Sequence, residues 1–152
     1  FTGVRAGVAA ARALALATGC QLLGVSTLDA LAAEARAKGV EGTLAIAVDA
    51  RREMAFFAIF TPGAVAAEPL FLPLDEAAAL ADAAGAILVG SGAPLLAARS
   101  ACTALHPDLQ PDARTFGPFA AARPPSTAVR PLYLRPPDAK AQASFVLPRA
   151  SP

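Results

Sequence analysis

The sequence predicts an α/β fold, and three observations lead to this class. Residues 43–72 alternate apolar runs with short turns, which is typical of an antiparallel meander of three strands. An amphipathic helix over 74–84 then precedes a buried strand over 86–90 and a glycine-rich turn. The first 38 residues carry two further helical patterns. Strands that alternate with helices indicate a sheet covered by helices.

The composition fits a globular chain and argues against several classes of function. Of the 152 residues 55% are hydrophobic, but many are alanine, and no uninterrupted apolar run reaches the ~18 residues that a membrane helix needs. Because 13 Lys and Arg balance 12 Asp and Glu, autonomous binding of nucleic acid through charge is not supported. Cys20 and Cys102 make no disulfide framework or metal site and are expected to be buried thiols. No secretory leader is visible, so we expect a cytoplasmic protein without a membrane segment.

Residues 3–18 are predicted to form a helix that is apolar nearly all round. Its two charges, Arg5 and Arg12, lie seven residues apart and share a narrow polar side. Small residues recur at every fourth position from Gly3, so they form a ridge on which another helix can pack closely. Two interpretations stay open: a central core helix, or a helix that also forms a subunit interface. The face predicted to bind a partner consists of Val4, Gly7, Val8, Ala11, Leu14 and Ala15.

A strand over 21–25 and a second helix from Ser26 to about Lys38 are predicted next. Ser26 is expected to be the N-cap of that helix, because Asp29 follows three residues later as in a capping box. Gly39 is expected to end the helix.

The meander is predicted to have strands over 43–49, 53–60 and 65–72, the last at a sheet edge because Pro69 interrupts it. The helix after the glycine-rich turn is expected to run to about Leu105. The resulting order is strand, strand, strand, helix, strand, turn, helix. This is the order of a ribonuclease-H-like lobe, the unit that is duplicated in the actin, Hsp70 and sugar-kinase superfamily.

The segments around this lobe predict a division into four parts. The beginning of the chain matches the helix–strand–helix end of a first lobe whose sheet we expect this chain to lack. The parts are a remnant of a first lobe (1–39), the second lobe (40–105), an irregular segment docking on the body (106–135) and a tail (136–152). Within the irregular segment, one short helix is predicted around 116–122, and the apolar stretch 131–135 is expected to make the docking contact.

Five short motifs follow one another in an order that a known family shares. They are Phe1-Thr2-Gly3-Val4-Arg5-Ala6-Gly7, Leu23-Gly24-Val25-Ser26-Thr27-Leu28-Asp29-Ala30-Leu31, Asp49-Ala50-Arg51-Arg52-Glu53, Val89-Gly90-Ser91-Gly92 and Leu132-Tyr133-Leu134-Arg135. Together they resemble the TsaB (YeaZ) family, a bacterial partner in making threonylcarbamoyladenosine on tRNA. One departure is that the family's Gly-Pro-Gly-Ser before Phe-Thr-Gly is absent.

The resemblance implies a two-lobed protein that catalyses no reaction itself. It implies binding to a TsaD-like catalytic subunit, in an assembly that a TsaE-like ATPase joins, with tRNA contacted only through the complex. In that family the interface is formed through first-lobe helices, and a similar surface can make homodimers. By resemblance, the helix over 3–18 belongs to this surface. No catalytic residue, metal ligand or cofactor is expected.

The residues themselves leave enzyme interpretations open. His106 is the single histidine, so it cannot reproduce the paired-histidine metal site of the catalytic subunit. Asp49 is either a turn residue paired with an arginine or, with Arg51, Ser91 and Gly92, part of an anion or polar site. The alternative function is therefore a nucleotide-binding enzyme of the same superfamily or a glycoprotease-like peptidase. A plain RNA-binding module is disfavoured, because one tyrosine and no tryptophan offer little surface for base stacking.

Overall fold

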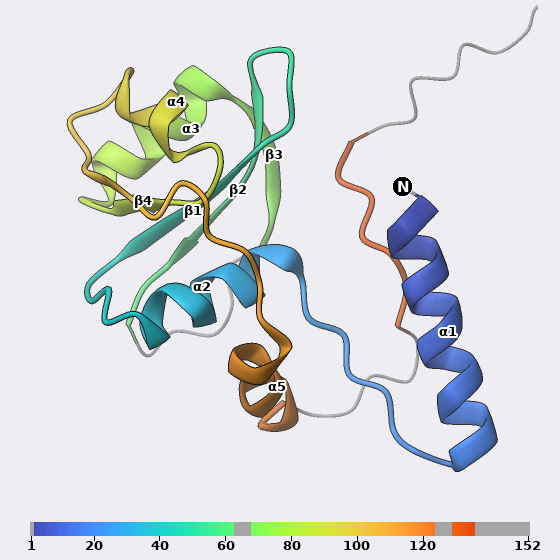
Figure 1. Cartoon of the computed structure of the whole chain (residues 1–152). Coiled ribbons are helices and arrows are strands. Elements are labelled where there is room, and N and C mark those ends of the chain that lie inside the picture. The colour runs from blue at the N-terminus through green and yellow to red at the C-terminus, as the bar shows by residue number, and fades with distance from the viewer. Residues whose placement is uncertain (1, 63–67, 124–128, 136–152) are drawn as a thin grey trace, which may run out of the picture.

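Figure 1 shows the computed structural model of the chain, which describes residues 2–62, 68–123 and 129–135. In chain order the elements are α1 (Thr2–Thr18), α2 (Thr27–Ala37), β1 (Leu44–Asp49), β2 (Met54–Phe60), β3 (Leu70–Pro73), α3 (Leu74–Ala83), β4 (Ile87–Val89), α4 (Ala93–Ala97), β5 (Ala104–Leu105) and α5 (Ala113–Ala121). The first residues of the predicted third strand and the predicted tail over 136–152 lie outside the described residues.

The five strands form one sheet in the order β3-β2-β1-β4-β5. β1, β2 and β3 pair as an antiparallel meander, while β4 pairs parallel to β1 and β5 parallel to β4. β3 lies at an edge, and Pro69 stands directly before its first residue. This order and these directions are those of a ribonuclease-H-like lobe, so the predicted α/β class is confirmed.

Helices cover both faces of the sheet, with α3 and α4 on one side and α2 and α5 on the other (Figure 1). Successive side chains of a strand point to opposite faces, so β1 divides its residues between two cores. Ala45 and Ala47 join the core under α3 and α4, while Leu44 and Ile46 join the core under α2. The largest fully buried side chains are Phe57, Leu44, Ile46, Leu88, Leu96 and Val89. Each such side chain stabilises the fold by about 1.5–3 kcal/mol relative to exposure.

α2 packs on this sheet. At its start the Ser26 hydroxyl oxygen accepts a hydrogen bond from the Asp29 N–H at 3.0 Å, and the Asp29 carboxylate accepts one from the Ser26 N–H at 3.3 Å. The predicted capping box is therefore present. The inner side chains, Leu28 and Leu31 among them, share the second core with β1. The predicted boundary between residues 39 and 40 thus separates two segments that are packed together.

Two predicted elements differ from the structure. Residues 21–25 form no strand, because no neighbouring strand of the described chain offers them a hydrogen-bonding edge. The helix that was predicted to reach Leu105 ends at Ala97. Beyond it the Asp82 carboxylate accepts a hydrogen bond from the Ala101 N–H at 2.9 Å, and 104–105 become β5 at the open edge of β4.

α1 forms over the predicted residues. None of its residues Thr2–Thr18 is buried by the described chain. Figure 1 shows α1 standing apart from the sheet, with residues 129–135 running alongside it. None of the helices in the described parts of the chain is long and apolar enough to cross a membrane.

Candidate functional site

The most exposed large apolar side chains of the described residues lie on α1 and on the segment beside it. On α1, Val4, Leu14 and Leu16 are 60%, 64% and 89% exposed. On the segment, Leu132 and Tyr133 are 59% and 51% exposed. Elsewhere in the described chain the exposed large apolar residues reach only 36–39%. Exposed apolar area gathered in one region is typical of an interaction site.

The face of α1 predicted to bind a partner is partly open. Val4, Gly7 and Leu14 are exposed, whereas the other three predicted residues are half-buried: Val8, Ala11 and Ala15. Among the described residues, no atom outside the helix lies within 4 Å of the position that a Cβ would take on Gly3 or Gly7. The N-terminal half of the ridge of small residues is therefore uncovered by the described chain.

α1 is joined to the segment 129–135 by one arginine and one tyrosine. The Nε–H of Arg5 donates a hydrogen bond to the Tyr133 hydroxyl oxygen at 2.6 Å. The guanidinium carbon of Arg5 also lies 5.4 Å from the centroid of the Tyr133 ring, within the range of a cation–π contact. The two residues are 128 positions apart, and no sequence signal paired them.

The same segment reaches two other parts of the molecule. Arg135 donates through Nη1 to the carbonyl oxygen of Ala50, in the β1–β2 turn, at 3.4 Å. At its other end, the Val129 methyl groups lie 3.6 and 3.7 Å from the Cβ position on Gly24 in the linker after α1. The segment thus contacts α1, the linker and the hairpin.

The predicted polar site lies at the carboxyl end of β1. The Asp49 N–H donates to the Ser91 hydroxyl oxygen at 3.2 Å, so the fold brings these two predicted residues together. The Asp49 carboxylate accepts from the Arg51 N–H at 2.8 Å and pairs with the Arg51 guanidinium at 3.2 Å. Asp49 is therefore paired with the neighbouring arginine, and Arg51 itself is largely in solvent.

Gly92, the fourth predicted residue, is engaged within the chain. Its N–H donates to the carbonyl oxygen of Ala47 at 2.9 Å, and it therefore does not point at an anion. A Cβ on Gly90, whose φ is +98°, would lie 2.6 Å from that same carbonyl oxygen, and one on Gly92 would lie 3.1 Å from the Ala47 Cβ. The turn between β4 and α4 is thus pressed onto β1.

The hairpin beside this site has a strained backbone. Arg51, Arg52 and Glu53 all have left-handed φ values, of 64°, 54° and 59°. Such conformations cost non-glycine residues about 1–3 kcal/mol each. Two kinds of contact hold the turn: the Leu74 N–H donates to the Glu53 carbonyl oxygen, and Arg99 pairs with the carboxylates of Glu53 and Asp75.

The remaining chemical groups are dispersed. In the described parts of the chain, no three His, Cys, Asp or Glu side chains are placed to hold a metal ion. His106 is exposed in the loop after β5. Cys20 is exposed, contrary to the expectation of a buried thiol, because α1 and its linker stand outside the core. Burial, followed by the hydrogen bond to Asp82 at 3.2 Å, raises the pKa of the Cys102 thiol.

A polar hollow of about 430 Å³ lies between α2 and the loop before α5. Charged side chains from both sides line it: Glu34, Lys38, Asp108 and Asp112. The Oε2 atom of Glu34 is buried there and has no hydrogen-bond partner among the described atoms. Hydrogen bonds from Arg114 lower the pKa of Asp112 to about 2, so this carboxylate is charged at neutral pH.

Comparison with solved structures gives proteins of one fold. A crystal structure described as an uncharacterized protein with similarity to peptidase YEAZ from Pseudomonas aeruginosa superposes with a TM-score of 0.70 and 30% identity. That match covers 89% of this chain and 68% of the other. YeaZ from Pseudomonas aeruginosa superposes with a TM-score of 0.67 and 28% identity, over 80% of this chain and 61% of the other.

Sequence comparison gives related results. The family described as TsaD: tRNA N6-adenosine threonylcarbamoyltransferase matches residues 1–85. Uncharacterized proteins of Mycobacterium bovis and Mycobacterium tuberculosis are 36% identical to this chain over 140 residues. The match takes in 92% of this chain, which spans 61% of the length of these curated relatives.

Proposed function

We propose, from the premise that the chain belongs to the TsaB (YeaZ) family, that it is a non-catalytic partner subunit in the synthesis of threonylcarbamoyladenosine on tRNA. Membership rests on the family match over residues 1–85, which is more than half of the chain, and on the YeaZ-like structure at 30% identity. The proposed role is to bind and support a TsaD-like catalytic subunit, which carries out the transfer reaction.

The exposure of α1 is the observation that carries this proposal. A 17-residue helix with two charges and no buried residue leaves apolar area in water that a partner could cover. Each exposed leucine that becomes buried against a partner contributes about 1.5–3 kcal/mol before the costs of association. A helix of this kind is suited to binding another helix.

The hydrogen bonds and the ion pair of the predicted polar site support an accessory role for the protein. Asp49 is paired with Arg51, Ser91 accepts from a backbone N–H, and the Gly92 amide bonds to Ala47. These groups stabilise the junction of β1, the hairpin and α4. A nucleophile hydrogen-bonded to a general base, the arrangement that covalent catalysis uses, is not among the interactions at this junction in the described chain.

The proposed assembly has further members. A TsaE-like ATPase joins the complex, and this protein contacts tRNA only through the complex. The complex acts in the cytoplasm. The same face of α1 would allow a homodimer when the catalytic subunit is absent.

Binding of the purified TsaD-like subunit from the same genome to the full-length protein tests the proposal. Gly7→Leu fills the open ridge where the described chain leaves space, so we expect it to raise the dissociation constant at least tenfold while the helix still forms. Ala9→Leu is the matched control, because Ala9 is exposed on the opposite side of α1 and should bind normally. Wild-type protein that does not bind the subunit would refute the proposed function.

A nucleotide-binding enzyme is the second candidate, because the fold brings Asp49 and Ser91 together at the carboxyl end of β1. Ligands of open α/β sheets commonly bind outside the carboxyl ends of parallel strands. Calorimetry with ATP separates the two functions. Tight binding that disappears in Asp49→Ala would favour the enzyme, whereas no heat in either protein favours the partner subunit.

A further inference from the structure

We propose that residues 129–135 are a strap that fixes the position of α1 relative to the sheet, and that α1 moves as a separate unit when the strap is released. The inference concerns a single molecule of this chain. It does not rest on the proposed function, because no partner protein takes part in it.

The position of α1 depends on contacts at its surface. None of its residues is buried by the described chain, so no core side chain anchors it. The buried residues of both cores of the sheet come from residues 28–109. The linker between α1 and α2, residues 19–26, has no regular secondary structure. The sheet and its helices can therefore remain folded whatever the position of α1, as a separate cooperative unit.

The strap contacts the linker and the beginning of α1. The Val129 methyl groups lie 3.6 and 3.7 Å from the Cβ position on Gly24. Four residues later, the Tyr133 hydroxyl oxygen accepts the hydrogen bond from Arg5 at 2.6 Å, and the Arg5 guanidinium carbon lies 5.4 Å from the Tyr133 ring centroid. Figure 1 shows the strap running toward the N-terminal end of α1, opposite to the direction of the helix. Tyr133 is therefore a positioning residue for α1.

The other end of the strap is anchored on the sheet. Arg135 donates through Nη1 to the carbonyl oxygen of Ala50 at 3.4 Å. Ala50 is itself fixed, because it is buried and its N–H donates to the carbonyl oxygen of Met54 across the hairpin at 3.0 Å. The strap thus joins α1 to a part of the backbone that the hairpin holds in place.

Exposure along the strap fits an extended segment with one side against the molecule. Val129 and Pro131 are half-buried, whereas Arg130 and Leu132 are exposed. Successive side chains of an extended chain point to opposite sides, so this alternation places one side of the strap inward.

The cover on α1 is confined to one side of the helix. Val8, Ala11 and Ala15 are half-buried, and the other residues of α1 are exposed. Their spacing of three and four residues places them in one stripe. A single extended segment along the helix covers a narrow stripe of this kind, whereas packing in a core covers a wider face.

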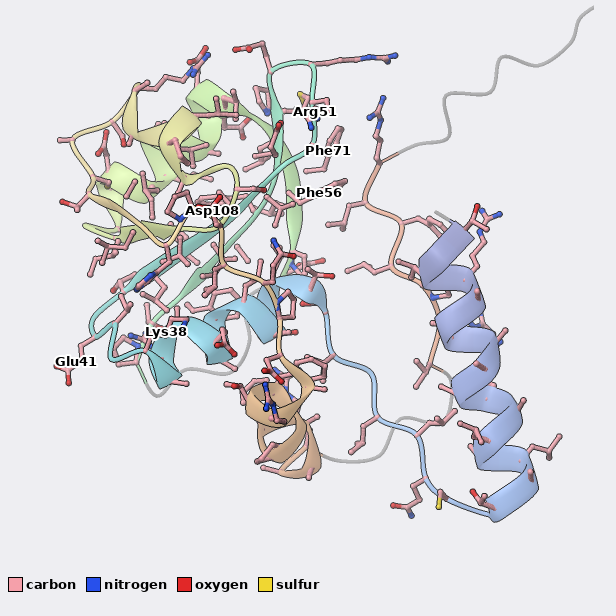
Figure 2. All side chains as sticks on the ribbon, in the orientation of Figure 1. Lys38, Glu41, Arg51, Phe56, Phe71 and Asp108 are labelled. Atoms are coloured by element: carbon pink, nitrogen blue, oxygen red, sulfur yellow. The ribbon has the colours of Figure 1, made fainter. Side chains whose placement is uncertain are left out.

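Two spin labels would measure the position of α1 directly. One is attached at Ala10→Cys, which is exposed on the side of α1 opposite the half-buried stripe. The other is attached at Glu41→Cys, which is exposed and lies on the side of the molecule away from α1 (Figure 2). Cys20 and Cys102 are replaced by serine so that no other thiol is labelled. Double electron–electron resonance then gives the distribution of distances between the labels, and we expect one narrow peak for the protein with an intact strap.

Variants of the Arg5–Tyr133 contact should broaden this peak. We expect Arg5→Gln and Tyr133→Ala each to widen the distance distribution about twofold or more, because each removes one partner of the contact. The double variant should be no wider than the wider single variant, since both changes break the same contact. Tyr133→Phe keeps the ring and loses the hydroxyl, so it should widen the distribution less than Tyr133→Ala.

Arg12→Gln is the matched control for Arg5→Gln. It makes the same change of charge at an exposed position of the same helix, and the distribution should stay as narrow as with an intact strap. Circular dichroism melts are the second control. Tyr133→Ala should melt at the wild-type temperature, because the two cores do not include the strap or α1.

Three results would overturn the proposal. In the first, Arg5→Gln and Tyr133→Ala leave the distribution as narrow as before, so the strap does not fix α1. In the second, the distribution is already as broad with an intact strap as in the variants. In the third, Tyr133→Ala lowers the melting temperature as much as Leu31→Ala, so the strap belongs to the folded core. All three leave the proposed function standing, because binding to the catalytic subunit is measured separately.

Discussion

α1 and α2 are both alanine-rich helices within the first 38 residues, but they are held in different ways. α1 has two charged residues in 17 and buries none of its side chains. α2 has three charged residues in 11 and buries six side chains, including the carboxylate-bearing Asp29. The more apolar helix is thus the more exposed one. An apolar helix is stabilised by burial against another surface. The position of the sheet decides whether the same chain provides that surface.

The largest expected effect contrasts a leucine in each helix. Leu31→Ala should lower the free energy of unfolding by about 3 kcal/mol, because it opens a cavity between α2 and the sheet. Leu14→Ala should change it by less than about 0.5 kcal/mol, because that side chain is already mostly in water. Urea denaturation of the two variants measures both values. Equal losses would show that α1 is packed in solution, and the contrast between the helices would disappear.

A smaller effect concerns the ion pair that fastens α5 to α2. Arg123 donates to the Asp29 carboxylate at 3.1 and 3.4 Å, and its guanidinium lies over the Phe119 ring at 4.5 Å. Asp29→Ala should therefore cost about 2 kcal/mol, since the capping box and the partner of Arg123 are lost together.

Asp75→Ala is the control for Asp29→Ala. Its carboxylate is 90% exposed in its pair with Arg99, so we expect a loss below about 0.5 kcal/mol in the same urea titration. If both carboxylates proved equally dispensable, α5 would be held by apolar packing alone.

The smallest effect contrasts the two cysteines, one in the linker after α1 and one in the lobe. Burial and Asp82 raise the pKa of Cys102, so its reactive thiolate is scarcer at pH 8 than that of an unperturbed thiol. We expect a maleimide to label the exposed Cys20 severalfold faster, and the Cys102 rate to keep rising above pH 9. Mass spectrometry of the two peptides measures this ratio. In denaturant the rates should become equal, and a ratio unaffected by unfolding would contradict the structural explanation.

Much of the lobe could be predicted because its signals are local. The apolar runs of β1 and β2, the Ser26 cap and the apolar period of α3 each lie within one element. What could not be predicted depends on distant partners. Residues 21–25 have the composition of a strand without an edge to pair with, and 104–105 form β5 because β4 offers one.

The contacts of the candidate site were likewise predictable only where both partners lie close together in the sequence. The predicted pairing of Asp49 with Arg51 is local, and helical spacing alone placed the six residues of the partner face on one side of α1. The contact of Arg5 with Tyr133 spans 128 residues, and only the fold brings it about. The sequence indicated only that the stretch holding the sole tyrosine of the chain should dock on the body, without naming Arg5 as its partner.

The close packing of Gly90 and Gly92 on Ala47 has a consequence for how sequences of this lobe can diverge. A side chain at either glycine would collide with the Ala47 backbone or methyl group, and a larger residue at 47 would collide with the turn. These three positions, one in β1 and two in the turn between β4 and α4, form one steric unit. The clash at Gly90 is with a backbone oxygen that any residue at 47 would carry, so position 90 should stay glycine in an alignment of relatives, whereas positions 47 and 92 should change only together.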